Sequence, residues 1–400
     1  MVGPKPPFVS SEVERRAAVS EGVSTTLDTN GDGKVSAPQR FIALDSLRGI
    51  AALFIVFYHM GPFGWVAGWT PFRSGWMLVD FFFVLSGFVI AMSYGARLAQ
   101  GYPRGSFLLI RLGRVVPLHL AVVAAFTLLE FAVFRPVLGE VHGWWEWVRG
   151  AFLLDAFATG AGNFYAPVSW AVGVEMVLYA LAALLFGRGR CGLAAAVLLA
   201  AAGAWGMATH FKVFGFGFLL QRGLFDFAIG VLAWRLHQRL SGIEPGAALL
   251  TFAEIALIGL LLWLLWVTGK DGSWVILAAP LFAAMVLVFA RDKGLVSRAL
   301  QAKPFLWLGQ LSFALFMVHL FWVILPNRFG PRLFAAMGRQ EWIAPVQQKY
   351  GLLSMAPPPA VATAISLALL AGALATAWLA WRYIEEPARH WARRFAPPQH

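Results

Sequence analysis

The sequence of 400 residues contains little charge and almost no cysteine. Only 13% of its residues are charged and 59% are hydrophobic, whereas a soluble domain of this size carries roughly twice that charged fraction. The membrane is therefore its predicted solvent. The single cysteine, Cys191, excludes an internal disulfide and a cysteine-based metal cluster. The first 40 residues contain no apolar segment ahead of a small-residue cleavage site, so no signal peptide is expected.

Basic residues are in excess, with 32 Lys and Arg against 20 Asp and Glu. They are scattered between apolar runs and form no continuous basic patch, so no nucleic-acid partner is predicted. Lys and Arg collect in the short cytoplasmic loops of membrane proteins. The basic residues therefore report topology, and the lipid bilayer is the first predicted partner.

Ten segments have the roughly 20 mostly apolar residues that a helix needs to cross a bilayer. The predicted fold is therefore an all-α integral membrane protein, a bundle of about ten transmembrane helices. A further stretch, "WWEWVRGAFLLDAFAT", is short and carries three charges, so we expect it to lie at the membrane interface. The ten segments are residues 42–60, 75–94, 107–134, 168–186, 192–208, 214–235, 247–268, 273–290, 305–325 and 361–382.

With ten crossings and a cytoplasmic N-terminus, nearly every compact basic cluster falls inside the cell. Both termini are then cytoplasmic, and the bacterial inner membrane is the expected location. The predicted organisation is an N-terminal cytosolic segment (1–40), a transmembrane domain (41–387) and a basic cytosolic tail (388–400).

The first apolar segment, "LDSLRGIAALFIVFYHM", carries a polar stripe. Arg48 and His59 are eleven residues apart, which puts them on one helix face, separated by about 16 Å along the axis. Asp45 falls on the same stripe. An ionisable group at this depth is costly unless it meets a partner or a cavity, so the stripe is expected to face the protein interior.

Counting residues from the helix ends places other polar side chains in two layers. Arg222 and Asp226, four residues apart, are expected to neutralise each other. The outer layer contains His59, Asp80, Glu175 and His319, and the cytoplasmic layer contains Arg48, Arg111 and Arg114.

This arrangement suits a molecule whose anionic end binds at the cytoplasmic side while its reactive end reaches the outer half. Acyl-coenzyme A has this form, since its phosphates bind guanidinium groups. His59 is then the expected general base for an acceptor hydroxyl. Asp45 lies too far down the helix to orient it, so an orienting carboxylate would come from Glu175 or Asp80.

Five motifs, in order, resemble those of the acyltransferase-3 family of polytopic membrane acyltransferases, and together they cover residues 42–387. They are Arg48 with ten residues before His59, "VDFFFVLSGFVI", "FLLIRLGRVVP", "SWAVGVEMVLYAL", and "LGQLSFALFMVHLFW" followed by "WRYIEEPAR".

The resemblance implies transfer of an acyl group, usually acetyl, from acetyl-coenzyme A to a hydroxyl of a carbohydrate or lipid-linked glycan. It makes His59 the catalytic base, Arg48 its companion, and Arg111 with Arg114 the donor-binding pair. Ser169 and Glu175 match the Ser and Glu of the "SWAVGVEMVLYAL" motif.

The chain departs from the family pattern beside two of these motifs. Gly173 and Val177 replace more polar or aromatic residues, and Phe313 and Phe316 stand where tyrosines are common. The lost hydroxyl groups favour a less polar acceptor.

Residues 28–39, "DTNGDGKVSAPQ", resemble an EF-hand calcium loop. Asp28, Asn30 and Asp32 match its ligand positions, but Gln39 replaces the bidentate glutamate and follows Pro38. The loop predicts either a much weakened calcium site or a turn-rich linker.

Each candidate also has a structural interpretation. His59 and His319 could be packing histidines, Arg111 and Arg114 topology anchors, and Asp80 and Glu175 hydrogen-bonding residues between helices. Ser169, which follows Pro167, is better explained as a helix N-cap than as a nucleophile.

Two other classes of function stay open from the sequence. They are a transporter that gates a polar solute with buried charges, and a membrane-tethered calcium sensor. The acceptor, the acyl chain length and the oligomeric state also stay open. Cell-surface polysaccharide, peptidoglycan, glycolipid and secondary metabolites all suit the acceptor role.

Overall fold

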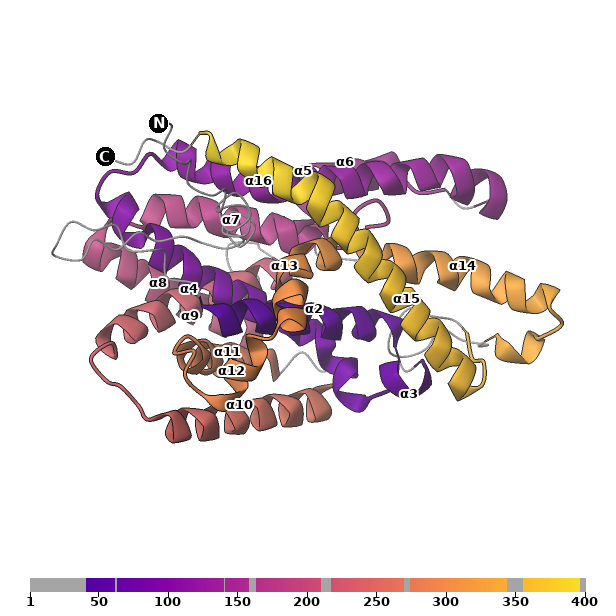
Figure 1. The fold of residues 1–400 in the computed structure, drawn as a ribbon. Helices are drawn as coiled ribbons and strands as arrows, with labels where there is room; N and C mark the ends of the chain where they lie inside the picture. The colour runs from indigo at the N-terminus through magenta and orange to yellow at the C-terminus, as the bar shows by residue number, and fades with distance from the viewer. Residues whose placement is uncertain are drawn as a thin grey trace, which may run out of the picture. The chain divides into compact units, whose positions relative to one another are not determined.

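The computed structural model describes residues 41–395 except 62, 140, 158–162, 210–216, 270–273 and 344–354. These residues are mainly helical (Figure 1). They contain no β-strand, only an isolated bridge between Ile343 and Met355. The longer helices are α2 (Ile42–Met60), α4 (Leu78–Ala99), α5 (Arg104–Leu129), α7 (Ser169–Leu185), α8 (Gly189–Thr209), α9 (Phe218–Arg239), α10 (Ala247–Thr268), α11 (Val275–Phe289), α13 (Lys303–Val318), α14 (Phe321–Ala336) and α15 (Pro359–Ala380).

Shorter helical segments connect or extend these helices. They are α3 (Gly64–Ala67), η1 (Thr70–Met77), η2 (Glu130–Leu138), α6 (Trp144–Ala151), η3 (Leu154–Phe157), α12 (Leu295–Leu300), η6 (Gln340–Trp342), η7 (Trp381–Glu385) and α16 (Glu386–Arg393).

The predicted all-α membrane fold is confirmed, but the count of about ten crossings is not. Nine of the ten predicted segments overlap one long helix each in the described residues, whereas the segment 305–325 is broken between α13 and α14. In the part of the chain that the structure describes, six helices are long and apolar enough to cross a membrane, and the bent pair α13 and α14 would make a seventh. The helices α7 and α11 are apolar but shorter, and α9 carries Arg222, Asp226, Arg235 and Arg239.

The Trp-rich stretch expected at the interface forms only the eight residues of α6 and the four of η3. At about 1.5 Å per residue, α6 is too short to span a bilayer. Trp144 and Trp145 are strongly exposed on it. Such exposed indole rings suit the interfacial position that the sequence predicts.

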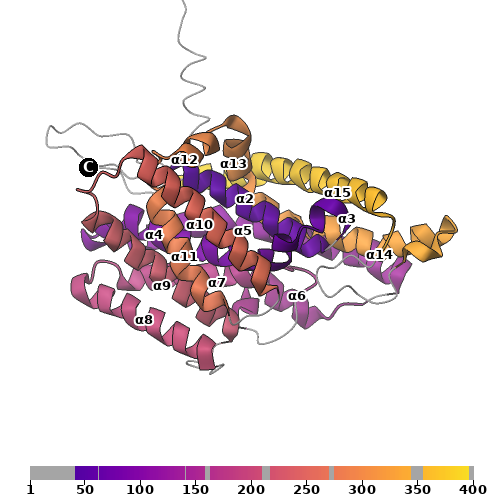
Figure 2. The same cartoon turned by 90° about the horizontal axis from the view of Figure 1, so that it is seen from below.

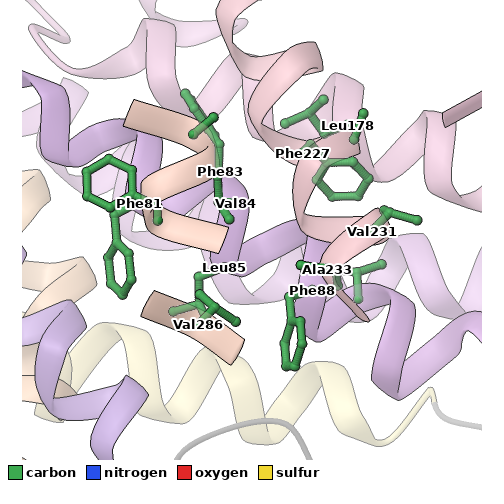
Figure 3. Close-up of a cluster of buried hydrophobic side chains, with 14 of the residues drawn as sticks. Phe81, Phe83, Val84, Leu85, Phe88, Leu178, Phe227, Val231, Ala233 and Val286 are labelled. Atoms are coloured by element: carbon green, nitrogen blue, oxygen red, sulfur yellow. The ribbon is translucent and has the colours of Figure 1, made fainter. Parts of the chain in front are cut away.

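Glycine allows α4 and α9 to pack with their backbones in contact. A Cβ atom added at Gly87 would lie 2.1 Å from Phe227 O, and one added at Gly230 would lie 2.0 Å from Val84 O. Small residues at helix crossings permit this approach in membrane proteins. Larger side chains then fill the space on either side, as Figure 3 shows for Val84, Leu85 and Phe88 of α4, Val231 and Ala233 of α9, and Val286 of α11.

The helix α10 lies at the edge of the bundle. Figure 1 places it along the lower edge, and Figure 2, seen from below, places it in front. Its outward side chains include Phe252 and Trp266, which are 70% and 59% exposed. Apolar side chains this exposed are those expected to contact lipid in a membrane helix.

At the C-terminal end, α15 continues through the π-helical turn η7 into α16 (Figure 1). Residues 388–393, which the sequence analysis assigned to a tail, therefore belong to a helix. This helix packs against α5: a Cβ atom added at Gly113 would lie 2.3 Å from the Cβ atom of Ala392.

Candidate active site

Two histidines from distant parts of the chain meet at the ends of α2 and α13. The Nδ1 atom of His59 lies 3.1 Å from the Nε2 atom of His319, and the ring centroids are 4.9 Å apart. His319 is fully buried, and His59 is half-buried. The sequence analysis expected both in one layer, and the structure brings them into direct contact.

The backbone around the pair determines which ring nitrogen carries each proton. His319 Nδ1 lies 2.8 Å from Phe316 O, and His59 Nδ1 lies 2.9 Å from Ile55 O. A carbonyl oxygen can only accept, so each Nδ1 donates. With both rings neutral, His319 Nε2 accepts from His59 Nδ1–H, and His59 Nε2 keeps its lone pair. Within the described part of the chain, that nitrogen has no hydrogen-bond partner.

A break between α13 and α14 creates the acceptor that holds His319. The two helices are bent by 49° at this point. In a continuous helix, Phe316 O would accept the amide of Leu320. Here it accepts Nδ1–H of His319 instead, and helical bonding resumes with Ile324 N donating to Leu320 O at 2.8 Å. The irregular backbone thus sets the orientation of the buried imidazole.

Glycines on both helices bring α2 against α13. A Cβ atom added at Gly49 would lie 2.6 Å from Gly309 N, and one added at Gly309 would lie 2.5 Å from Asp45 O. This contact lets Arg48 donate from Nε to Ser312 Oγ at 3.0 Å and from Nη2 to Gly309 O at 3.2 Å. Asp45 Oδ1 lies 3.8 Å from Arg48 Nη2. The polar stripe of α2 therefore faces α13, as predicted.

Arg111 lies among aromatic rings. Its guanidinium carbon lies 4.8 Å from the ring centroid of Tyr94, 5.7 Å from that of Tyr179 and 5.9 Å from that of Phe107. Its side chain is buried, and its Nε has no hydrogen-bond partner among the described residues. Aromatic faces stabilise a cation without using its N–H groups. The donors of Arg111 are therefore available to an anion.

The Tyr94 ring is shared with a second arginine. Arg97 lies 5.3 Å from its centroid and also contacts the Tyr102 ring, at 4.3 Å. Arg97 is less buried than Arg111. The Tyr94 ring therefore lies between the half-buried guanidinium group of Arg97 and the buried guanidinium group of Arg111.

Glu175 lies beside the arginines rather than beside His59. The Tyr179 hydroxyl donates to Glu175 Oε1, and Glu175 interacts electrostatically with both Arg114 and Arg48. The expectation that Glu175 shares a layer with the two histidines came from counting residues along one helix. The contacts of Glu175 connect it instead to the cytoplasmic layer of the sequence analysis.

Asp80, which the sequence analysis considered as the carboxylate that orients His59, pairs instead with an arginine. Its carboxylate pairs with Arg222, which additionally donates from Nη2 to Trp76 O at 2.9 Å. Arg222 was expected to be neutralised by Asp226, one turn along the same helix. Within the described residues, both oxygens of Asp226 and the Oδ2 atom of Asp80 instead have no hydrogen-bond partner.

Ser169 binds the segment that precedes α7 and is not the N-cap of that helix. The helix begins at Ser169, and Val168 is its N-cap. Ser169 Oγ donates to Asp155 Oδ2 at 2.5 Å, and Asn163 Nδ2 donates to the same oxygen at 2.7 Å. Arg149 Nη1 lies 3.6 Å from the other oxygen of Asp155. These bonds hold η3 and Asn163 against the start of α7.

The sequence analysis singled out no residue of η7 or α16, yet these two segments contribute charges that interact with Arg48 and Arg114. Glu385, at the end of η7, interacts electrostatically with both, and Arg389 Nη1 lies 3.6 Å from Glu385 Oε1. The motif "WRYIEEPAR" contained the signal: Glu385 and Arg389 are four residues apart and share one helix face.

The candidate calcium ligands Asp28, Asn30 and Asp32 lie outside the described residues. Among residues that the structure does describe, no group of three or more His, Cys, Asp or Glu side chains could hold a metal ion. The described site is thus made of imidazole, guanidinium, carboxylate and phenol groups.

Comparisons with known proteins agree with the motif resemblance. The chain is 36% identical to protein 2 in the picA locus of Rhizobium radiobacter over 153 residues, covering 36% of this chain and 73% of that protein. It is 26% identical to nodulation protein 10 of Rhizobium leguminosarum bv. viciae over 314 residues, covering 69% of this chain and 81% of that protein. No solved structure gives a significant match. Residues 41–382 match the acyltransferase domain, so the chain belongs to the acyltransferase-3 family and is a multi-pass membrane acyltransferase.

Proposed function

We propose that this acyltransferase takes an acyl group, acetyl in the simplest case, from acyl-coenzyme A. It places that group on a hydroxyl of a carbohydrate, a glycolipid or a related acceptor. Between the enzyme and the transporter, two of the classes of function that the sequence left open, membership of the family favours the enzyme. The identities of the acyl donor, the acceptor and the catalytic base are our proposals.

The observation that carries the proposal is the contact between the two histidine rings, together with the backbone carbonyls beside their Nδ1 atoms, from which the protonation of each ring is inferred. His59 Nδ1–H is engaged by Ile55 O and His319 Nε2, which leaves the lone pair on His59 Nε2. A neutral imidazole with its other nitrogen held as a donor is the arrangement that a general base requires. When His59 accepts a proton, His319 Nε2 and Ile55 O stabilise the resulting imidazolium.

The reaction balances without a further co-reactant. His59 Nε2 removes the proton of the acceptor hydroxyl while the hydroxyl oxygen attacks the thioester carbonyl carbon. The carbon–sulfur bond then breaks, and the coenzyme A thiolate leaves. Thiolates are good leaving groups near neutral pH, so no strong general acid is needed. The imidazolium returns its proton to the thiolate, and His59 is neutral again. Transfer through a transient acyl-imidazole is the alternative order.

Arg111 and Arg114 suit the phosphate groups of the donor. Arg111 is held by aromatic rings, and neither arginine forms an ion pair with a carboxylate among the described residues. Guanidinium groups bind phosphate with two parallel hydrogen bonds. Glu175, hydrogen-bonded by Tyr179 and electrostatically coupled to Arg114, positions that arginine in our proposal.

Arg48 connects the two ends of the site. It lies on α2 with His59, eleven residues and about 16 Å away along the helix, and it interacts electrostatically with Arg114. We propose that the arginine end faces the cytoplasm, where the donor is made, and that the histidine end faces the outer half of the bilayer. Both termini are then cytoplasmic, and the bacterial inner membrane is the proposed location.

The surroundings of His319 favour an acceptor that is less polar than a free sugar. The Phe316 ring lies 6.1 Å from the His319 ring and 6.1 Å from the Phe82 ring. An apolar wall of this kind suits a lipid-linked glycan or another acceptor with an apolar part. Asp80, held by Arg222, and Ser169, held by Asp155, have structural roles in this proposal.

The test is transfer from labelled acetyl-coenzyme A in membranes that contain the protein. His59→Ala should abolish transfer without lowering the amount of folded protein, whereas His390→Ala, at an exposed position on α16, should have no effect. Retained turnover in His59→Ala would refute the assignment of the base. Mass spectrometry of glycans and lipids from cells with and without the protein should reveal a missing acetyl group and so identify the acceptor.

A further inference from the structure

The helix α16 meets α5 where α5 carries its two arginines. Gly113, which lies between Arg111 and Arg114, is the point of contact with Ala392. Only a residue without a side chain fits there, since an added Cβ atom would lie 2.3 Å from the Ala392 Cβ atom. The C-terminal helix therefore borders the proposed donor site (Figure 1).

Glu385 is buried beside this contact with few partners. It is 2% exposed. Its Oε1 atom lies 3.6 Å from Arg389 Nη1, which is longer than a hydrogen bond, and its Oε2 atom has no hydrogen-bond partner among the described residues. A buried carboxylate is stable only when it is closely paired and hydrogen-bonded. Glu385 is instead surrounded at longer range by Arg389, Arg114 and Arg48.

The backbone before Glu385 is itself irregular. Residues Trp381–Glu385 form the π-helical turn η7 between the α-helices α15 and α16. Such turns are uncommon and are found frequently at functional sites. The turn aims Glu385 and Arg389 at α5, whereas Arg382 and Glu386 pair on the exposed side, with Arg382 Nη1 2.9 Å from Glu386 Oε2.

We propose that Arg389 is a further donor-binding residue and that Glu385 is an internal counter-ion, which the phosphate groups of acyl-coenzyme A replace among the arginines. This inference rests on the proposed use of acyl-coenzyme A. In the empty enzyme, the Glu385 carboxylate neutralises part of the charge of Arg48, Arg114 and Arg389. An arriving phosphate takes over these guanidinium groups and forms the short hydrogen bonds that Glu385 does not form.

The two residues of this buried pair should have opposite effects on donor affinity. Glu385→Gln removes the competing carboxylate and keeps its shape, so it should tighten coenzyme A binding about fivefold. Arg389→Ala removes a cation, so it should weaken binding about tenfold, the effect of losing one charge-assisted hydrogen bond. A merely structural ion pair would instead give two variants that both lose stability and shift affinity in the same direction.

The chain offers a matched control. Arg382 and Glu386 have the same four-residue spacing on the same helical segment but lie on its exposed side. Glu386→Gln and Arg382→Ala should therefore leave coenzyme A affinity unchanged. Arg389→Lys keeps the charge without the two-pronged geometry and should fall between wild type and Arg389→Ala.

The measurement is direct binding of coenzyme A, without acyl group or acceptor, to the purified full-length protein in detergent. Thermal unfolding of each variant is recorded alongside. If wild type does not bind coenzyme A, the proposed donor is wrong. If wild type binds but Glu385→Gln binds equally or more weakly, or if Arg389→Ala and Arg389→Lys both bind like wild type, this inference alone is overturned.

Discussion

The histidine pair gives a quantitative prediction for His319. Replacing it by alanine removes the Nε2 acceptor that lies 3.1 Å from His59 Nδ1, while Ile55 O still accepts from the same N–H group. The tautomer of His59 therefore survives, but the imidazolium that forms during catalysis loses one of its two acceptors. We expect a smaller defect than that of His59→Ala.

The size of the defect follows from the type of hydrogen bond that is lost. A bond to a charged group contributes about 1.5–3 kcal/mol, and each 1.36 kcal/mol corresponds to a tenfold change in rate. His319→Ala should therefore lower kcat roughly 10- to 150-fold. The KM for acyl-coenzyme A should not change, because the donor-binding arginines lie elsewhere.

His319→Gln separates this effect from a loss of packing. A glutamine amide oxygen can accept from His59 Nδ1–H, so this variant should retain more activity than His319→Ala. The assay is the initial rate of labelled acetyl transfer to endogenous acceptors in membranes, at equal amounts of folded protein. A His319→Ala enzyme with unchanged kcat would refute the role assigned to the pair, as would a defect confined to KM.

Three further predictions concern the donor site, the helix contact and a cap. Arg111→Ala with Arg114→Ala should raise the KM for acyl-coenzyme A at least tenfold, and an unaltered KM would contradict donor binding. Gly309→Ala would place a methyl carbon 2.5 Å from a backbone oxygen of α2, so it should lower stability by about 1–3 kcal/mol and reduce kcat; normal unfolding and activity would argue against the tight contact. The Asp292 carboxylate accepts hydrogen bonds from the backbone amides of Ile42 and Ala43, at the start of α2, at 3.2 and 3.0 Å. The backbone of Asp292 has a φ of 51°. Asp292→Ala should therefore cost about 2 kcal/mol in thermal unfolding and Asp292→Asn clearly less, and equal losses would disprove the cap.

Asp292 also gives a pH dependence. Burial raises the pKa of its carboxyl group, so the ionised form is less favourable in the folded protein than in the unfolded chain. This penalty is present above the raised pKa and disappears as the pH falls through it. Wild type should therefore gain stability relative to Asp292→Asn when the pH is lowered from neutral through that pKa, as measured by paired thermal unfolding.

Local regularities made much of the fold predictable. Apolar runs of about 20 residues predicted the helices, because a membrane helix must bury its backbone polar groups in its own hydrogen bonds. The eleven-residue spacing of Arg48 and His59 predicted a shared face, and the structure turns that face toward α13. The number of crossings was harder, since α9 is helical and buried yet carries four charged residues.

The partners of the polar residues could not be predicted in the same way. His59 and His319 are 260 residues apart in the chain, and their contact depends on a helix break that has no strong signal in the sequence. Arg222 has a carboxylate one turn away, but pairs with Asp80 on another helix. Counting residues along single helices gave the approximate depth of each polar side chain in the membrane. Which side chains form pairs depends on how the helices pack, and this cannot be counted along one helix.

The glycine contact between α2 and α13 has a consequence for the choice of donor. The close contact at Gly49 and Gly309 keeps α13 in register with α2, so that Ser312 stays beside Arg48 and His319 stays beside His59. Arg48 and His59 lie on one helix, so the distance between them is fixed. A carrier whose flexible arm matches that length delivers its carbonyl to the imidazole while its charged end stays anchored. A truncated thioester that lacks the nucleotide has nothing to anchor, so it should react slowly and without saturation, however reactive its carbonyl is in solution.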